Sequence, residues 1–257
     1  MSGGAGNGAA VAIETATETV GVAVRTPDGL QAEFALTGRR RHVETLTPAL
    51  DHLLAQLDLT PRDLSLVAVD VGPGLFTGLR VGVAAAKGLG QALGVGVVGV
   101  SSLDVLAAAA RAAGHRGPVL ACVDARRGEV FAAVYGSAVH GPGASGVADA
   151  DGDTAPVLGP GLFAPGDLVD ALGRTQGGPL MAVGDGAQRY AGELVGVPGL
   201  IVAAPALGFP PPTSLLDLAL ARVAAGESPA DPAGVVPRYL READARINFE
   251  RIDRPAP

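Results

Sequence analysis

The chain has 257 residues, of which 48% are hydrophobic, so it is long enough and apolar enough to form one or two domains with a substantial core. Its formal net charge of −7 argues against a dedicated nucleic-acid surface, because clustered Lys and Arg supply most of the affinity for a phosphate backbone. We therefore expect a globular protein and, if RNA is its substrate, a separate subunit that holds the RNA.

Cysteine usage and hydropathy indicate the compartment. Cys122 is the single cysteine and lies in an apolar run, so it can form no internal disulfide and suits a reducing environment. Residues 1–10 have neither the basic nor the apolar part of a signal peptide, and Lys87 interrupts the Ala- and Gly-rich stretch at 81–100. We expect a soluble cytoplasmic protein without a membrane span.

The first sixty residues predict three strands followed by a helix. The strands are expected at residues 11–14, 21–25 and 31–36, with turns at 15–18 and 27–29. Apolar residues at helical spacing then predict an amphipathic helix that begins near His42 and runs to Leu57. Pro48 marks either its first turn or a kink.

The stretch from Asp70 to Gly94 organises the rest of the chain. A short apolar run at 64–69 predicts a buried strand, and Gly72-Pro73-Gly74 then favours a tight turn into a helix. Thr77 is the expected N-cap of this helix. Its first free amide groups would lie beside a glycine-rich loop, which is how proteins build a phosphate site.

Small residues also recur every four positions along this predicted helix, at Gly78, Gly82, Ala86, Gly90 and Gly94. Glycine inside a helix costs about 1 kcal/mol relative to alanine, so close packing must offset the loss. Either a neighbouring element of the same subunit or a helix of a partner approaches this face. In the second case the interface would also take residues of the preceding helix, and the candidate partner-binding residues are Val43, Leu46, Leu50, Gly78, Gly82 and Ala86.

Four stretches together resemble one protein family. They are Ile-Glu-Thr-Ala-Thr-Glu at residues 13–18, Gly-Pro-Gly-Leu-Phe-Thr-Gly-Leu-Arg-Val-Gly at 72–82, Asp-Ala-Arg-Arg-Gly at 124–128 and Pro-Arg-Tyr-Leu-Arg at 237–241. The second is similar to the shared core of the bacterial tRNA threonylcarbamoyladenosine biosynthesis proteins TsaB and TsaD. The last two resemble segments typical of the TsaB family, whereas TsaD is its catalytic relative.

The resemblance implies a two-lobed α/β fold of the actin/Hsp70-like ATPase (ribonuclease H-like) architecture. In active members of that superfamily, an acidic residue and a glycine-containing first turn hold metal and phosphate. Here Glu14 and Thr15 remain, but bulkier residues at 16–18 replace the glycine. We expect no tightly bound cofactor, and ATP or ADP only at a subunit interface. A vestigial phosphate site would comprise Glu14, Thr15, Gly72, Gly74 and Thr77.

The sequence departs from TsaD at the positions of the TsaD metal site. Two histidines four residues apart reach one metal ion in TsaD, and their positions fall here on Ser102 and Leu106. A hydroxyl is a poor ligand and leucine is none, so the resemblance implies neither a metal site nor catalytic residues. The carboxylates near strand ends, Asp104, Asp124 and Glu129, have no paired-acid spacing that would single them out.

The second half predicts another α/β lobe. Strands are expected at residues 119–124, 129–135, 179–183 and 201–203, and helices at 167–172, 187–194 and 214–225, the last capped by Thr213. Residues 136–161 are rich in Gly, Ala, Asp and Pro and favour a loop or flexible insertion. We expect an N-terminal lobe at 1–110, a C-terminal lobe at 111–212, and a closing segment at 213–257 that returns to the first lobe.

The function implied by the resemblance is that of a non-catalytic scaffold subunit. It would dimerise with TsaD, act with the small ATPase TsaE, and help to transfer threonylcarbamoyl to the adenosine beside the tRNA anticodon. The tRNA would be bound only through the complex, and the basic cluster at residues 39–41 would at most extend the partner's surface. The isolated chain could form a homodimer. The alternative is a free-standing enzyme, either an ATP-dependent kinase or a metal-dependent glycopeptidase.

Overall fold

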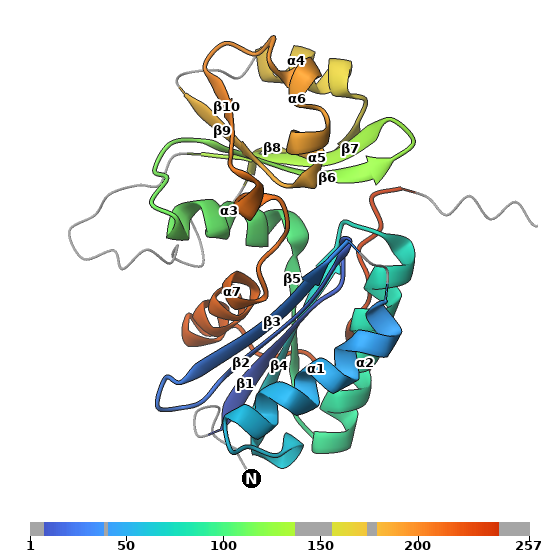
Figure 1. The fold of residues 1–257 in the computed structure, drawn as a ribbon, viewed down its shortest axis with the longest axis vertical. Helices are drawn as coiled ribbons and strands as arrows, with labels where there is room; N and C mark the ends of the chain where they lie inside the picture. Colours follow the sequence, from blue (N-terminus) through green and yellow to red (C-terminus); the bar gives the residue numbers. More distant parts are fainter. Residues whose placement is uncertain (1–7, 39–40, 137–155, 174–178, 242–257) are drawn as a thin grey trace, which may run out of the picture.

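The computed structural model describes residues 8–38, 41–136, 156–173 and 179–241, which form two lobes around two separate sheets (Figure 1). The first sheet has the order β3-β2-β1-β4-β5, with β1 antiparallel to β2, β2 antiparallel to β3, and β4 parallel to both β1 and β5. The strands are β1 Ala9–Glu14, β2 Thr19–Arg25, β3 Gln31–Thr37, β4 Leu64–Gly72 and β5 Val97–Ser101. The three predicted N-terminal strands and the strand at 64–69 are thus present.

Helices cover both faces of this first sheet. The helices α1 (His42–Gln56) and α2 (Phe76–Leu93) pack on one face, where Val11 and Ile13 of β1 point. On the other face lies α7 (Pro212–Ala224), which reaches Ala10 and Ala12. Every residue of β1 is therefore buried, which explains why this strand reads as a continuous apolar run rather than as an alternating one.

The second sheet repeats the first in strand order and direction. Its order is β10-β9-β6-β7-β8, with β6, β7 and β8 antiparallel in turn and β9 parallel to β6 and β10. The strands are β6 Val119–Arg126, β7 Glu129–Tyr135, β8 Pro156–Phe163, β9 Leu180–Val183 and β10 Leu200–Val202. In both sheets a three-stranded antiparallel meander is followed by two parallel strands. This shared topology confirms the two-lobed actin/Hsp70-like architecture.

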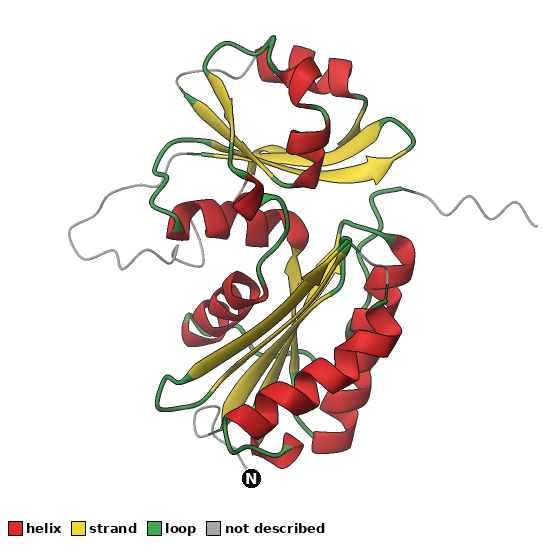
Figure 2. Ribbon diagram, in the orientation of Figure 1, coloured by secondary structure: helices red, strands yellow, loops and turns green. Residues whose placement is uncertain are grey.

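The helices of the second lobe also lie on both faces of its sheet (Figure 2). The helix α3 (Ser102–Ala112) packs on the face toward the first lobe. On the far face are α4 (Pro165–Gly173), α5 (Asp185–Arg189) and α6 (Ala191–Leu194). Short 3-10 turns complete the described chain: η1 Pro61–Asp63, η2 Pro205–Leu207 and η3 Pro232–Gly234. Among the described residues, no helix combines the length and apolar character needed to cross a membrane.

The structure differs from the sequence expectations at three places. Thr77 and Thr213 are not N-caps. The N-cap positions are Leu75 and Pro211, and α2 and α7 begin at Phe76 and Pro212, one residue before each threonine. Part of the expected loop at 136–161 is a strand, since β8 pairs antiparallel with β7, while residues 137–155 lie outside the described part. The expected helix at 187–194 is divided into α5 and α6.

Candidate functional site

Two acidic side chains meet beneath the glycine-rich loop. Glu14 ends β1 and Asp70 lies near the end of the parallel neighbour β4, and both are fully buried. Glu14 Oε1 accepts a hydrogen bond from the Ala16 amide at 2.8 Å. Asp70 Oδ1 accepts one from the Gly72 amide at 2.7 Å and one from the Ser102 hydroxyl at 2.6 Å. The remaining oxygens, Glu14 Oε2 and Asp70 Oδ2, are buried, and neither accepts a hydrogen bond from a third group in the described structure.

This arrangement favours a proton shared by the two carboxyl groups. Burial raises the pKa of Glu14 well above its ordinary value, and the neighbouring charge of Asp70 raises it further. Burial also raises the pKa of Asp70, although hydrogen bonds from Glu14, Ser102 and the Gly72 amide oppose that rise. Two carboxylates this close in a dry site cannot both be charged without a large penalty, so we assign the proton to Glu14.

The β1–β2 turn, residues 15–18, closes the loop that was expected to bind phosphate. The Thr15 hydroxyl donates to the Gly78 carbonyl at 2.8 Å, and the Leu75 amide donates to the Ala16 carbonyl at 2.6 Å. A Cβ at Gly78 would overlap the Thr15 carbonyl oxygen, and one at Gly74 would overlap the Ala16 carbonyl oxygen. Glycine is required at these two positions because the turn packs directly against them.

The candidate phosphate-site residues are only partly brought together in this conformation. Glu14, Thr15, Gly72 and Gly74 do lie together, but backbone carbonyl oxygens face the loop and repel an anion. Gly72 has a φ of +103° and is covered by the Arg238 carbonyl oxygen, which would lie 2.9 Å from an added Cβ. Thr77 is exposed and does not cap α2.

The candidate partner-binding residues divide into two groups. Gly78, Gly82 and Ala86 are buried, and the close approach to the two glycines comes from Thr15 of the same chain. Leu46 is buried and Leu50 packs half-buried against the same core. Val43 remains 70% exposed. Of the six candidates, Val43 therefore has the one mostly exposed side chain in this conformation.

The two positions that the resemblance equates with histidines of TsaD, Ser102 and Leu106, are both buried here. The Ser102 hydroxyl is buried and bonded to Asp70, and Leu106 is buried in the core between α3 and the second sheet. Within the described part of the chain, no group of three or more His, Cys, Asp or Glu side chains is arranged to hold a metal ion.

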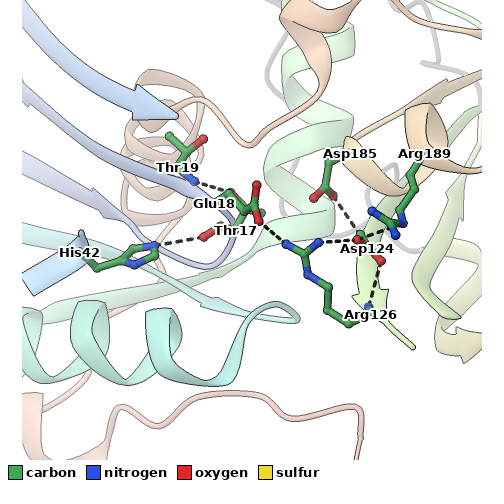
Figure 3. A network of polar contacts seen from close by, with 8 residues as sticks. All are labelled: Thr17, Glu18, Thr19, His42, Asp124, Arg126, Asp185 and Arg189. Carbon is green, nitrogen blue, oxygen red and sulfur yellow. Dashed lines mark hydrogen bonds and ion pairs between the residues drawn. The ribbon is translucent and has the colours of Figure 1, made fainter. Parts of the chain in front are cut away.

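A charged network joins the two lobes (Figure 3). Arg126, at the end of β6, donates to Glu18 of the β1–β2 turn at 2.6 Å and to Asp124 at 2.9 Å. Asp124 is almost fully buried and has a second cation, Arg189, at 3.6 Å. Its backbone amide donates to Asp185 at 2.9 Å, and burial raises the pKa of Asp185 to about 6. The network links the turn that closes the loop to the β6–β7 hairpin.

The C-terminal segment, residues 235–241, forms a second connection between the lobes. Val235 packs in the core of the first lobe, and the Arg238 amide donates to the Val71 carbonyl at 2.7 Å. Leu240 packs against the core of the second lobe. Arg241 then donates to the Ala125 carbonyl at 2.8 Å and forms an ion pair with Glu129. The Pro-Arg-Tyr-Leu-Arg motif thus fastens the β6–β7 hairpin to the first lobe.

Sequence reasoning missed the partners of several of these groups. It found no catalytic spacing for Asp124 and Glu129 and did not predict that both are in ion pairs, and it gave Asp70 no role. One signal for Asp70 was available. Glu14 and Asp70 each follow a buried apolar strand, and the carboxyl ends of adjacent parallel strands lie at one edge of a sheet.

Comparison with known proteins places the chain in a family. Residues 32–147 match the family described as "TsaD: tRNA N6-adenosine threonylcarbamoyltransferase". The chain is 38% identical over 125 residues to the tRNA threonylcarbamoyladenosine biosynthesis protein TsaB of Bacillus subtilis (strain 168), which covers 49% of this chain and 54% of that protein. The uncharacterized protein Rv3421c of Mycobacterium tuberculosis (strain ATCC 25618 / H37Rv) is 41% identical over 150 residues, 58% of this chain and 69% of the relative.

The likeness extends to structure. The solved structure of YeaZ from Pseudomonas aeruginosa superposes with a TM-score of 0.74 at 26% identity, over 91% of this chain and 100% of that chain. By sequence, the chain spans about half the length of the curated TsaB relatives it matches. The four sequence stretches, the duplicated sheet topology and these matches agree, and the chain belongs to the TsaB/YeaZ family.

Proposed function

We propose that this chain is a non-catalytic subunit of the complex that transfers threonylcarbamoyl to the adenosine beside the tRNA anticodon, and that it acts by pairing with the catalytic subunit TsaD. The observation that carries the proposal is the match to proteins named TsaB, at 38% and 36% identity. The small ATPase TsaE would act with this pair.

The interior of the chain supports a role without chemistry of its own. At the two positions that the resemblance equates with metal-binding histidines of TsaD, Ser102 is hydrogen-bonded to Asp70 and Leu106 is buried in the core. The carbonyl oxygens of Thr15 and Ala16 face the glycine loop, so we propose that the isolated subunit binds no nucleotide tightly. ATP or ADP would bind, if at all, where a second subunit completes the site.

We propose that the pairing surface lies at the first turn of α1. This turn exposes Val43, one of the eight exposed large apolar side chains in the described structure. In the absence of TsaD, the same surface could pair two copies of this chain.

The test is reconstitution of tRNA modification with purified subunits. TsaD and TsaE of the same organism should form threonylcarbamoyladenosine efficiently only when this chain is added, and this chain alone should be inactive. Val43→Glu should weaken pairing, because it places a charge in the apolar contact. Val195→Glu is the matched control, since Val195 is 81% exposed on the second lobe. Equal activity with and without this chain would refute the proposal.

A second measurement addresses the tRNA. The isolated chain should bind tRNA no more tightly than about 0.1 mM at physiological salt, because its net charge is −7. The cluster at residues 39–41 includes Arg41, which is exposed at the start of α1, whereas residues 39–40 lie outside the described structure. Replacing all three arginines with alanine should lower the tRNA affinity of the complex modestly and leave pairing intact.

A further inference from the structure

Two aromatic side chains lie together on the surface of a chain that has few of them. The sequence contains six Phe, three Tyr and no Trp. Phe76, the first residue of α2, and Tyr239, in the C-terminal segment, are each 44% exposed. Their ring centroids are 5.2 Å apart and their planes are tilted by 34°. Large aromatic rings are mostly buried in proteins, so an exposed pair suggests a surface that contacts a ligand.

An arginine fixes the geometry of this pair. The guanidinium carbon of Arg80 lies 3.8 Å from the centroid of the Phe76 ring, and Arg80 Nε donates to the Tyr239 hydroxyl at 3.3 Å. Both neighbours of Tyr239 in the sequence are anchored. The Arg238 amide donates to the Val71 carbonyl of β4, and Leu240 packs against the core of the second lobe. We call these three side chains the aromatic platform; because they are already ordered, a ligand would lose little entropy in binding to them.

The platform is locally cationic although the chain as a whole is acidic. Neither α2 nor residues 232–241 contain an Asp or Glu. Of the cations in these two segments, Lys87 is bonded to the carbonyls of Ala233 and Val235, and Arg241 is paired with Glu129. Arg80 on the platform and the exposed Arg238 beside it have no carboxylate partner in the described structure. The platform therefore combines aromatic faces with positive charge that no described carboxylate neutralises.

We infer that the aromatic platform stacks an unpaired base of an RNA loop, with Arg238 beside the phosphate of that nucleotide. Unpaired bases are recognised by stacking on aromatic rings and guanidinium planes, and the phosphates require nearby cations. The inference rests on the proposed function, which makes tRNA the substrate of the complex. A single stacked base on an acidic chain binds weakly, which agrees with an RNA held mainly by the partner.

The small number of tyrosines, three in the whole sequence, makes a direct test possible. With ring carbons of tyrosine labelled, the chain gives one set of NMR signals each for Tyr135, Tyr190 and Tyr239. The probes are a stem-loop RNA with an unpaired loop and a blunt duplex with the sequence of its stem. The stem-loop should shift the Tyr239 signal saturably and the duplex should not. Tyr190 is the internal control, because it also has an arginine, Arg189, 5.8 Å from its ring.

Variants of the platform sharpen the test. Phe76→Ala and Arg80→Ala should each weaken the stem-loop titration of the Tyr239 signal about tenfold or more, and Tyr190→Phe should leave it unchanged. Equal shifts with stem-loop and duplex, or no shift at Tyr239, would overturn the inference. So would a Tyr239 shift that appears with TsaD alone and not with RNA, since the platform would then be a protein contact. Because this readout requires no catalysis or pairing, its failure is distinct from a failure of the reconstitution.

Discussion

The buried proton on Glu14 predicts how the stability of the protein depends on pH. In the folded state burial and Asp70 raise the pKa of Glu14 well above 4.5, whereas in the unfolded chain it titrates normally. Between these two values the folded state binds one proton more than the unfolded state. The free energy of unfolding must therefore fall as the pH rises through this interval, and the contribution is fully present only below the unfolded pKa.

The expected size follows from linkage. One proton of difference lowers the stability by about 1.4 kcal/mol for each pH unit inside the interval, so two units remove nearly 3 kcal/mol of a total that is typically 5–15 kcal/mol. Glu14→Gln should abolish this loss. Its amide oxygen can accept from Ala16 as Oε1 does, and its NH2 group can donate to the unpartnered Asp70 Oδ2. The variant should therefore be more stable than the wild type at pH 8.

Urea unfolding of wild type and Glu14→Gln from pH 5 to pH 8 measures the effect. The comparison with the wild type is needed because Asp185, with a pKa near 6, adds a slope of the same sign to both proteins. Glu33→Gln, on the exposed side of β3, removes the same charge from the surface and serves as the control. Parallel pH profiles for wild type and Glu14→Gln would refute the assignment of the proton to Glu14.

Two further predictions concern contacts made by the β1–β2 turn. Gly78→Ala should lower the free energy of urea unfolding by about 1–3 kcal/mol, because its Cβ would overlap the Thr15 carbonyl oxygen. Gly88→Ala is the control: it has open space around it and should raise the free energy of unfolding by about 1 kcal/mol. An unchanged stability of Gly78→Ala would contradict the packing of the turn against α2. Arg126→Ala should accelerate hydrogen exchange in the β1–β2 turn and in the β6–β7 hairpin together. The variant loses the ion pair with Glu18, and the buried Asp124 keeps a single cation, Arg189, at 3.6 Å. Unchanged exchange in either segment would count against a link between the lobes.

The sequence predicted the elements of the fold because their signals are local. Runs of apolar residues bounded by turns identified β1 to β4, β6, β7, β9 and β10. They missed β8, in which Gly159, Pro160 and Gly161 interrupt the apolar pattern. The two N-caps were predicted wrongly because each helix begins one residue before the threonine, at Phe76 and at Pro212. Spacing alone also predicted that something approaches the glycine face of α2 closely.

The contacts of the site could not be predicted in the same way because they are not local. Glu18 and Arg126 are 108 residues apart, and Ser102 lies 32 residues from Asp70. Residue spacing showed that Gly78 and Gly82 admit a close neighbour, but the identity of that neighbour depends on where the β1–β2 turn lies after folding. The burial that raises the pKa of Glu14 is likewise a property of the assembled sheet.

Four consecutive residues of that turn each contact a different part of the molecule. Thr15 contacts Gly78, Ala16 accepts from Leu75, the Thr17 carbonyl binds His42, and Glu18 binds Arg126 of the other lobe. The turn therefore connects the glycine loop, α1 and the second lobe through bonds within the chain. The surfaces proposed here for pairing and for RNA lie elsewhere, on the outside of the molecule, around Val43 at the first turn of α1 and at Phe76 and Tyr239.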